Sequence, residues 1–323
     1  MTQYLAGVDL GGTYIKTALV TFEGEIVQKV EVDSEKEKGP DGVISNIHKS
    51  VEMAVEKAGC EIHDVKGIGI GSPGPMDTKE GIVTRPVNLP GWENVPLRKK
   101  VSEYFNLPGN LENDANAAAY GEYWKGGGQG SELMIAYTLG TGVGGGIVIR
   151  GHLVRGTNDV AGELGHMTIK DGGELCNCGN HGCLEAYASA TALVRRSLAK
   201  LNSGAESILR KWIDEGRELS AKLINEARLE GDEFARDALE ELGYYLGVGI
   251  SAMVNALNPD VVVIGGGVMN AGDVILNPAR EVVKEKTFSE FYENLKIEPA
   301  QLGNDAGVIG SAGLLIERGI VSQ

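Results

Sequence analysis

The chain has 323 residues, of which 42% are hydrophobic and 23% charged, a composition typical of a globular protein and a length that favours two domains. Its formal net charge of −15 argues against nucleic acid or an anionic membrane as the main partner. No signal-peptide pattern precedes the first predicted strand and no apolar run approaches membrane-spanning length, so we expect a cytoplasmic protein.

Short apolar runs predict strands, and apolar residues three or four positions apart predict helices. In chain order, the first half is predicted to contain a strand at 4–9, a hairpin of strands at 15–22 and 26–32, a helix between Asp41 and Gly59, a strand at 65–70 and a short helix at 95–105. Asp41 is expected to cap its helix and Gly59 to end it.

The second half repeats the beginning of the first. It is predicted to contain strands at 133–139 and 144–149, a helical region from 184 to about 258, a buried strand at 261–264 and a final helix at 304–318. Because each half has an apolar strand, a glycine turn and a hairpin, we predict a duplicated α/β fold. The expected domains are a small N-terminal one at 1–112, completed by the helix at 305–323, and a larger one at 113–304.

Three glycine-rich turns follow predicted strands and are suited to binding phosphate, because consecutive glycines let backbone N–H groups point at anionic oxygens. They are Gly11, Gly12 and Thr13; Gly140, Thr141 and Gly142; and Gly265, Gly266 and Gly267. Phosphates would repel Asp9 unless Mg²⁺ lay between them. Lys16 either reaches a phosphate or lies on the hairpin surface. The Walker A and G-x-G-x-x-G patterns are not matched, so a non-Walker nucleotide site is predicted.

Asn113 and Asp114 directly precede an alanine-rich run at 115–119 that is expected to be helical. Asp114 either caps this helix or acts as a general base that accepts the proton of an attacking hydroxyl in phosphoryl transfer. The helix dipole would keep such a carboxylate ionised.

Three cysteines lie within eight residues, at Cys176, Cys178 and Cys183. Thiolates at this spacing, with an imidazole within reach, predict a four-ligand zinc site. A chance cluster is disfavoured because the spacing is rare, and a disulfide would leave one thiol unpaired. The fourth ligand is His166 or His181, and we favour His166 because the ring of His181 would have to fold back on its own loop.

Amide and carboxylate side chains near these motifs are suited to sugar hydroxyls. Asn88 lies in a proline-rigid loop, where an amide offers both a donor and an acceptor. Trp92 in the same loop either stacks on a sugar ring or belongs to the core. Glu163 and Glu185 are close in sequence to the proposed metal ligands, so a metal would hold both in one wall; the alternative is that both are solvated surface residues.

Together these motifs resemble the ROK family of sugar kinases, within the hexokinase–actin–Hsp70 superfold, over essentially the whole chain. The resemblance rests on the cysteine cluster and on the runs at 9–16, 111–116, 140–146, 162–166 and 263–267. It implies a two-domain α/β, ribonuclease H-like ATPase fold with a catalytic cleft between the domains. The contexts of Asn88 and Glu163 resemble bacterial glucokinases most closely.

The resemblance also implies a reaction and the residues that perform it. Asp114 would accept the proton of the glucose 6-hydroxyl as that oxygen attacks the γ-phosphorus of ATP, giving glucose 6-phosphate and ADP. Glucose would be bound by Asn88, Asn113, Asp114, Glu163, His166 and Glu185. MgATP would be bound by Asp9, Lys16 and the three glycine turns.

The implied zinc is structural and shapes the sugar-binding wall. Its ligands would be His166, Cys176, Cys178 and Cys183, with the second ring nitrogen of His166 turned toward a sugar hydroxyl. A homo-oligomer, either a dimer or a tetramer, is also implied.

Two rival hypotheses belong to other functional classes. A sugar-responsive repressor of the same family needs a DNA-binding helix-turn-helix, and we expect none because the first phosphate motif begins at residue 9. An ATP-hydrolysing assembly module of the actin–Hsp70 kind would have no use for the sugar wall or the cysteine cluster. Within the kinase class, fructose, N-acetylmannosamine and allose are alternative substrates.

Overall fold

The computed structural model describes residues 3–86 and 89–322. These residues form two compact units that interleave along the chain. Unit 1 is formed by the described residues of Met1–Glu132, Gly146–Gly162 and Gln301–Gln323, and unit 2 by Leu133–Gly145 and Glu163–Ala300. Within the described part of the chain, no helix is long and apolar enough to cross a membrane.

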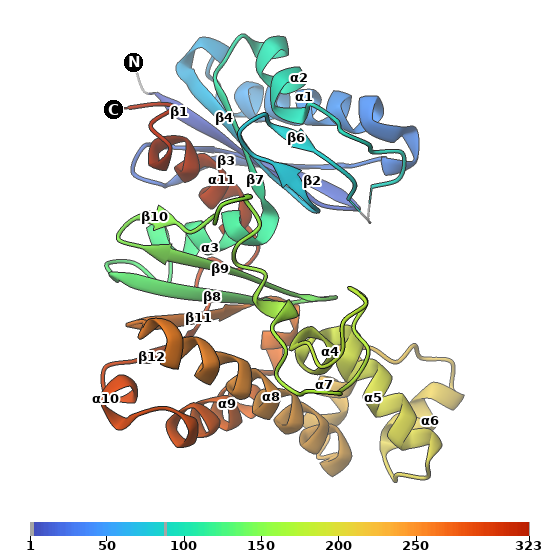
Figure 1. Cartoon of the computed structure of the whole chain (residues 1–323). Coiled ribbons are helices and arrows are strands. Elements are labelled where there is room, and N and C mark those ends of the chain that lie inside the picture. Colours follow the sequence, from blue (N-terminus) through green and yellow to red (C-terminus); the bar gives the residue numbers. More distant parts are fainter. Residues whose placement is uncertain (1–2, 87–88, 323) are drawn as a thin grey trace. The chain divides into compact units, whose positions relative to one another are not determined.

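Unit 1 is built on a five-stranded sheet, counted over the described residues, with the order β3-β2-β1-β4-β7 (Figure 1). Its strands are β1 (Tyr4–Leu10), β2 (Tyr14–Val20), β3 (Ile26–Asp33), β4 (Val65–Ser72) and β7 (Gly109–Asn113), beside a small hairpin of β5 (Met76–Asp77) and β6 (Ile82–Val83). Its helices are α1 (Gly39–Ala58), α2 (Leu97–Phe105), α3 (Asp114–Lys125) and α11 (Ala306–Glu317). β1, β4 and β7 are parallel, whereas β2 and β3 form an antiparallel hairpin with β1.

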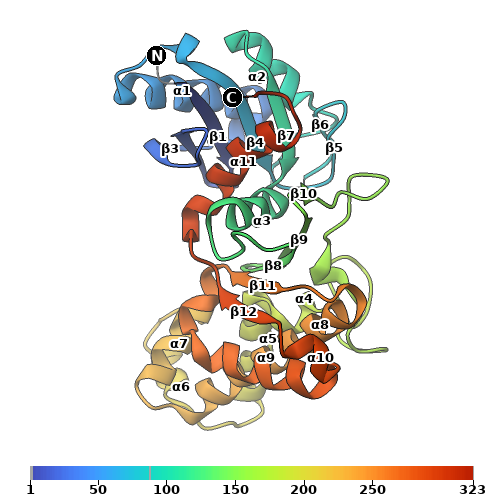
Figure 2. The same ribbon diagram turned by 90° about the vertical axis from the view of Figure 1, so that its left-hand side faces the viewer.

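Alternating residues of β1 fill the cores on the two faces of this sheet. Ala6 and Val8 pack with residues of α1 and α2, and Leu5 packs with residues of α11. A methyl group on Gly7 would lie 1.9 Å from the carbonyl oxygen of Val308, so only glycine lets α11 approach the sheet this closely. Figure 2 shows α11, in red, against the sheet and beside α3.

The predicted elements of the first half are confirmed, with one correction. The hairpin turns at residues 21–25, and α1 ends at Gly59, which adopts the left-handed conformation with φ 66°. The prediction that Asp41 caps α1 is wrong, because the helix begins at Gly39 and Asp41 lies in its first turn. Pro40, at the start of the helix, accounts for this, since its fixed φ favours the first helical positions.

The sheet of the second half has the order β10-β9-β8-β11-β12 among the described strands. These are β8 (Leu133–Leu139), β9 (Val143–Ile149), β10 (His152–Leu153), β11 (Val261–Gly265) and β12 (Lys296–Pro299). The helices of unit 2 are α4 (Glu185–Ala188), α5 (Ala190–Asn202), α6 (Ile208–Asp214), α7 (Ala221–Leu229), α8 (Glu233–Leu257), α9 (Asp273–Lys286) and α10 (Ser289–Tyr292). β8, β11 and β12 are parallel, and β9 begins in unit 2 and ends in unit 1.

The helical region predicted at 184–258 is divided into successive helices by polar caps. The side chains of Ser189, Ser207, Ser220 and Asp232 accept backbone hydrogen bonds at the starts of α5, α6, α7 and α8. Such caps satisfy N–H groups that have no partner within the helix. The longest helix, α8, packs against α9 through Gly243, where a methyl group would lie 2.4 Å from the carbonyl oxygen of Ile275.

The two sheets share one topology, which confirms the predicted duplication and the two-domain α/β fold. Each sheet has three parallel strands, which are β1, β4 and β7 in the first sheet and β8, β11 and β12 in the second. Two antiparallel strands extend each sheet on one side, β2 and β3 in the first and β9 and β10 in the second. Parallel strands bring the loops that follow them to one edge of their sheet. Every predicted phosphate-binding turn and the Asn113–Asp114 pair lie at or directly after the ends of such strands.

Candidate active site

The carboxyl edge of the unit 1 sheet brings Asp9 and Asp114 into one neighbourhood. Asp9 in β1 is in register with Gly71 in β4, and Gly71 is in register with Glu112 in β7. Asp114 follows two residues after Glu112, at the first position of α3. A methyl group on Gly71 would lie 3.7 Å from the Cα of Asp114, an ordinary contact distance, which places Gly71 directly beside Asp114.

Asn113, not Asp114, caps helix α3. Oδ1 of Asn113 accepts hydrogen bonds from the backbone N–H groups of Ala115 and Asn116 at 3.0 and 3.2 Å. Among the described residues, the Asn113 side chain forms hydrogen bonds only through Oδ1, which leaves its Nδ2 able to donate to a ligand. Asp114 Oδ1 accepts a hydrogen bond from the Ala115 N–H at 2.8 Å.

Burial makes both carboxyl groups easier to protonate than an exposed aspartate. Burial, followed by the Asp114 charge, raises the pKa of Asp9 from 3.8 to about 6, against an opposing effect of Lys16. Burial also raises the pKa of Asp114, while the backbone N–H of Ala115 acts in the opposite direction. Two neighbouring carboxylates with raised pKa values are suited to holding a divalent cation and to accepting a proton.

A buried network of ion pairs supports the backbone next to Asp114. It was not predicted from the sequence. We call it the buried ion network, and its members are Glu112, Arg155, Glu317 and Arg318. Arg155 Nε lies 2.7 Å from Glu112 Oε2, and its Nη2 lies 2.8 Å from Glu317 Oε2. The other oxygen of Glu112 accepts hydrogen bonds from the Asn113 N–H and the Asn116 side chain. The network therefore fixes the backbone that carries Asn113 and Asp114.

The first glycine turn joins β1 to β2, as predicted. Gly11 N–H donates to Tyr14 O at 2.9 Å, and Ser34 binds the carbonyl groups of Gly12 and Thr13. The Thr13 side chain is exposed. Lys16 is the cross-strand neighbour of Asp9 and lowers its pKa, so it lies beside the carboxylate pair.

The other two glycine turns lie together at the carboxyl edge of the unit 2 sheet. Gly140, Thr141 and Gly142 follow β8, whereas Gly265 is the last residue of the parallel strand β11 and Gly266 and Gly267 follow it. Gly266 has φ 93°, and a methyl group there would lie 2.3 Å from the carbonyl oxygen of Leu139. Only glycine allows these two turns to approach each other this closely.

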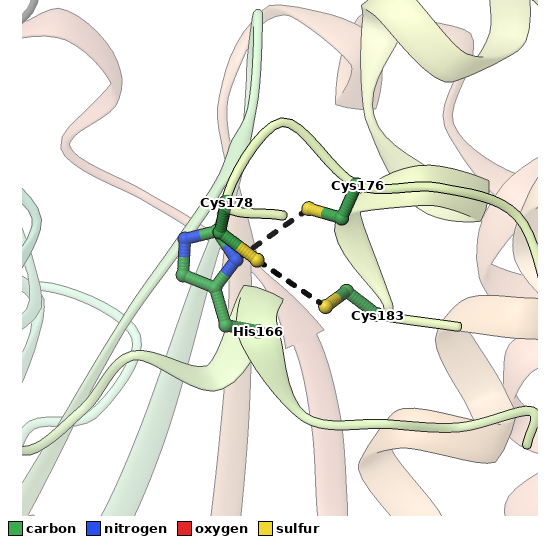
Figure 3. A group of neighbouring side chains, drawn as sticks. All are labelled: His166, Cys176, Cys178 and Cys183. Carbon is green, nitrogen blue, oxygen red and sulfur yellow. Dashed lines mark hydrogen bonds between the residues drawn. The ribbon is translucent and has the colours of Figure 1, made fainter. Parts of the chain in front are cut away.

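The cysteine cluster has the geometry of a tetrahedral metal site (Figure 3). The ligand atoms of His166, Cys176, Cys178 and Cys183 all lie within 4.8 Å of one another. Cys178 Sγ is 3.7 Å from Cys183 Sγ, too long for a disulfide and close to the separation of about 3.8 Å that Zn–S bonds of about 2.3 Å require. Burial raises the pKa of Cys176 to about 12, so a cation is needed to hold it as a thiolate at neutral pH.

The preference for His166 over His181 as the fourth member is confirmed. Nδ1 of His166 lies 3.7 Å from Cys176 Sγ, whereas Nδ1 of His181 lies 3.0 Å from the carbonyl oxygen of Gly173. The cluster fits the structural zinc site expected from the sequence. Nε2 of His166 faces away from the sulfur atoms and lies 4.0 Å from Glu163 Oε2.

The remaining predicted sugar-binding residues are divided between the units. Asn113 and Asp114 belong to unit 1, whereas Glu163, His166 and Glu185 belong to unit 2. Asn88 lies outside the described residues. Trp92 is 3% exposed and packs in the unit 1 core, which favours the core role over sugar stacking. Glu163 is exposed, whereas Glu185 is partly buried and accepts a hydrogen bond from the Val143 N–H at 2.9 Å.

Comparisons with known proteins identify the family of this chain. The family model described as "ROK family" matches residues 5–318. A glucokinase of Halalkalibacterium halodurans is 42% identical over 97% of this chain and 95% of its own length. The xylose repressor of Caldicellulosiruptor bescii is 37% identical over 97% of this chain and 78% of its own length. The structure of a ROK family glucokinase from Streptomyces griseus in complex with glucose and AMPPNP matches with a TM-score of 0.81 and 37% identity, covering 96% of this chain and 98% of that one. The chain belongs to the ROK family.

Proposed function

We propose that this protein transfers the γ-phosphoryl group of ATP to the 6-hydroxyl of glucose, giving glucose 6-phosphate and ADP. The observation that carries the proposal is the Asp114 carboxylate, which lies at the start of α3 beside Asp9, while a different residue caps the helix. The similarity to the glucokinases of Halalkalibacterium halodurans and Thermotoga maritima supports glucose as the substrate.

In the proposed reaction, Asp114 accepts the proton of the 6-hydroxyl as that oxygen forms a bond to the γ-phosphorus. The bond between this phosphorus and the bridging oxygen of ADP breaks, and ADP leaves with those electrons. Asp9 would hold Mg²⁺, which neutralises charge on the phosphates when it is bound. Lys16 and the N–H groups of the turns at 11–13 and 140–142 would bind the phosphates, as other anion-binding nests do, and the turn at 265–267 would lie beside adenosine.

Glucose would be held by Asn88, Asn113, Glu163, His166 and Glu185. In this role Asn113 donates from Nδ2, the group that capping leaves available. His166, Cys176, Cys178 and Cys183 would hold zinc. When bound, this zinc fixes the ring orientation of His166 and supplies no chemistry to the transfer itself.

The experiment that tests the proposal is ADP release from purified protein with MgATP and a panel of hexoses. Glucose should stimulate release strongly, and Asp114→Asn should lower kcat by about 10²- to 10⁴-fold while the circular dichroism spectrum and the melting temperature stay close to those of the wild type. Turnover in Asp114→Asn equal to that of the wild type would refute the assignment of the base. Stimulation by fructose, N-acetylmannosamine or allose instead of glucose would keep the kinase and change its substrate.

A sugar sensor without catalytic activity is the second candidate, because xylose repressors are among the relatives. In that case, sugar would bind with measurable heat while no hexose stimulated ADP release. The same panel with xylose added, repeated by titration calorimetry, therefore separates the two functions.

A further inference from the structure

The helical segment that follows the cysteine cluster is hydrogen-bonded to the glycine turn between β8 and β9. Glu185 Oε2 accepts from the N–H of Val143 at 2.9 Å, the N–H of Ala190 donates to Gly140 O at 2.8 Å, and Thr191 Oγ1 donates to Thr141 O at 2.7 Å. All of these residues belong to unit 2. Three bonds to one four-residue turn fix its backbone more tightly than the internal bond from Gly140 N–H to Gly142 O does alone.

Close packing adds to these bonds on both sides of the turn. A methyl group on Gly142 would lie 2.3 Å from Glu185 Oε2, and one on Gly165 would lie 2.0 Å from the carbonyl oxygen of Val143. Glycine at these two positions thus lets the turn lie directly against Glu185 on one side and the segment 163–166 on the other. The turn therefore cannot shift without moving Glu185 or the segment 163–166, which contain proposed sugar-binding residues.

Glu185 reaches the cysteine cluster with its other oxygen. Oε1 lies 3.6 Å from Cys176 Sγ, and the residue follows Cys183 by two positions. One carboxylate therefore contacts both the turn and the cluster. Its two oxygens are not equivalent, because Oε2 is already used by a backbone N–H.

We infer that Glu185, assisted by Thr191, is a positioning residue for the phosphate-binding turn at 140–143, in addition to its proposed contact with the sugar. The inference rests on the proposed function, because it assigns the turn to nucleotide. It predicts that nucleotide affinity depends on Glu185 even when no sugar is present. A residue that bound only sugar would have no such effect.

The test is calorimetric titration of the zinc-loaded protein with MgAMPPNP in the absence of sugar. Glu185→Ala should raise the Kd roughly tenfold, because an N–H in the turn loses a charged partner. Glu185→Gln retains an oxygen for the Val143 N–H and should restore most of the nucleotide affinity. Glu163→Ala is the matched control: it removes another proposed sugar contact, but the exposed Glu163 carboxylate does not bond the turn in the described structure.

A second pair of variants guards against loss of folding in Glu185→Ala. Thr191 is exposed, so Thr191→Val should fold normally and raise the Kd for MgAMPPNP about threefold, while Thr191→Ser keeps the hydroxyl and the wild-type affinity. Equal nucleotide affinity in the wild type, Glu185→Ala and Thr191→Val would overturn the inference and leave the proposed function intact. A wild-type protein that did not bind MgAMPPNP would overturn both.

Discussion

Replacing Asp9 with asparagine should stabilise the folded chain at neutral pH, although it removes a proposed active-site residue. Burial and the Asp114 carboxylate raise the pKa of Asp9 from 3.8 to about 6. A carboxyl group with a higher pKa in the folded than in the unfolded chain costs stability when it is ionised. This cost is absent at pH values well below 3.8, grows as the pH rises to about 6, and is complete above that.

The size of the effect follows from the same pKa values. At about 1.36 kcal/mol per pKa unit, the raised pKa of Asp9 costs about 3 kcal/mol near pH 7.5, where the group is ionised in the folded chain, and about 1 kcal/mol near pH 4.5, where it is ionised mainly in the unfolded chain. Asp9→Asn carries no charge at either pH. The difference in the free energy of unfolding between the variant and the wild type should therefore grow by about 2 kcal/mol from about pH 4.5 to about pH 7.5.

Urea unfolding followed by tryptophan fluorescence measures this difference, because urea is uncharged and does not screen the carboxylates. Trp92 and Trp124 lie in unit 1 together with Asp9, whereas Trp212 lies in unit 2. In a Trp212→Phe background the signal reports the unfolding of unit 1 alone. The wild type and the variant share the cysteine cluster of unit 2, so an effect of acid on this cluster cancels in the difference between them.

The control is Asp41→Asn, which removes an exposed carboxylate from the same unit. It should change the free energy of unfolding by less than about 0.5 kcal/mol at either pH. A difference between Asp9→Asn and the wild type that stays constant from about pH 4.5 to about pH 7.5, or that shrinks, would refute the reasoning. Added Mg²⁺ should stabilise the wild type and not Asp9→Asn, because only the wild type keeps the carboxylate that we propose as its ligand.

Two further predictions concern the cysteine cluster and the buried ion network. Cys178→Ser should lose zinc, measured by atomic absorption, and should bind glucose more weakly in calorimetry. A variant that lacks zinc and binds glucose as the wild type does would contradict the proposal that zinc positions the sugar-binding residues. Glu112→Ala should lower the free energy of unfolding by about 3 kcal/mol, because it leaves a buried guanidinium with one carboxylate fewer. Glu112→Gln should lose less, since it can still accept from the Asn113 N–H, and a loss below about 1 kcal/mol for Glu112→Ala would show that Glu317 suffices to pair Arg155.

Elements with a strong local signal could be predicted from the sequence. The run at 261–264 is apolar throughout and forms the buried strand β11, and Gly59 ends α1 in a conformation that glycine adopts readily. β7 carries no such signal, because Leu111 is its one apolar residue and the polar residues Asn110 and Glu112 are buried in it. α9 was not predicted either, since it contains Pro278, a residue that usually ends helices.

The features of the candidate site likewise include some that could be predicted from the sequence and some that could not. The cysteine cluster and the glycine turns are short segments, so spacing and residue type are sufficient to find them. The preference for His166 needed one step of geometry, and the structure bears it out. The capping of α3 by Asn113 depends on which of two adjacent polar residues lies outside the helix, and the sequence alone does not decide that.

The ion network shows why the contacts that support the site could not be predicted from sequence patterns. Glu112, Arg155 and Glu317 are separated by 43 and 162 residues, and each is an ordinary charged residue in its own segment. The parallel register of β4 with β7 places Glu112, and the packing of α11 against this sheet places Glu317, whereas Arg155 comes from the segment after β10. Since removing either acidic partner leaves a buried charge with fewer partners, this network couples the stability of unit 1 to the backbone that positions Asp114. The residues that support the proposed catalytic base are thus fixed by tertiary contacts, whereas the base itself lies in a motif that can be read locally.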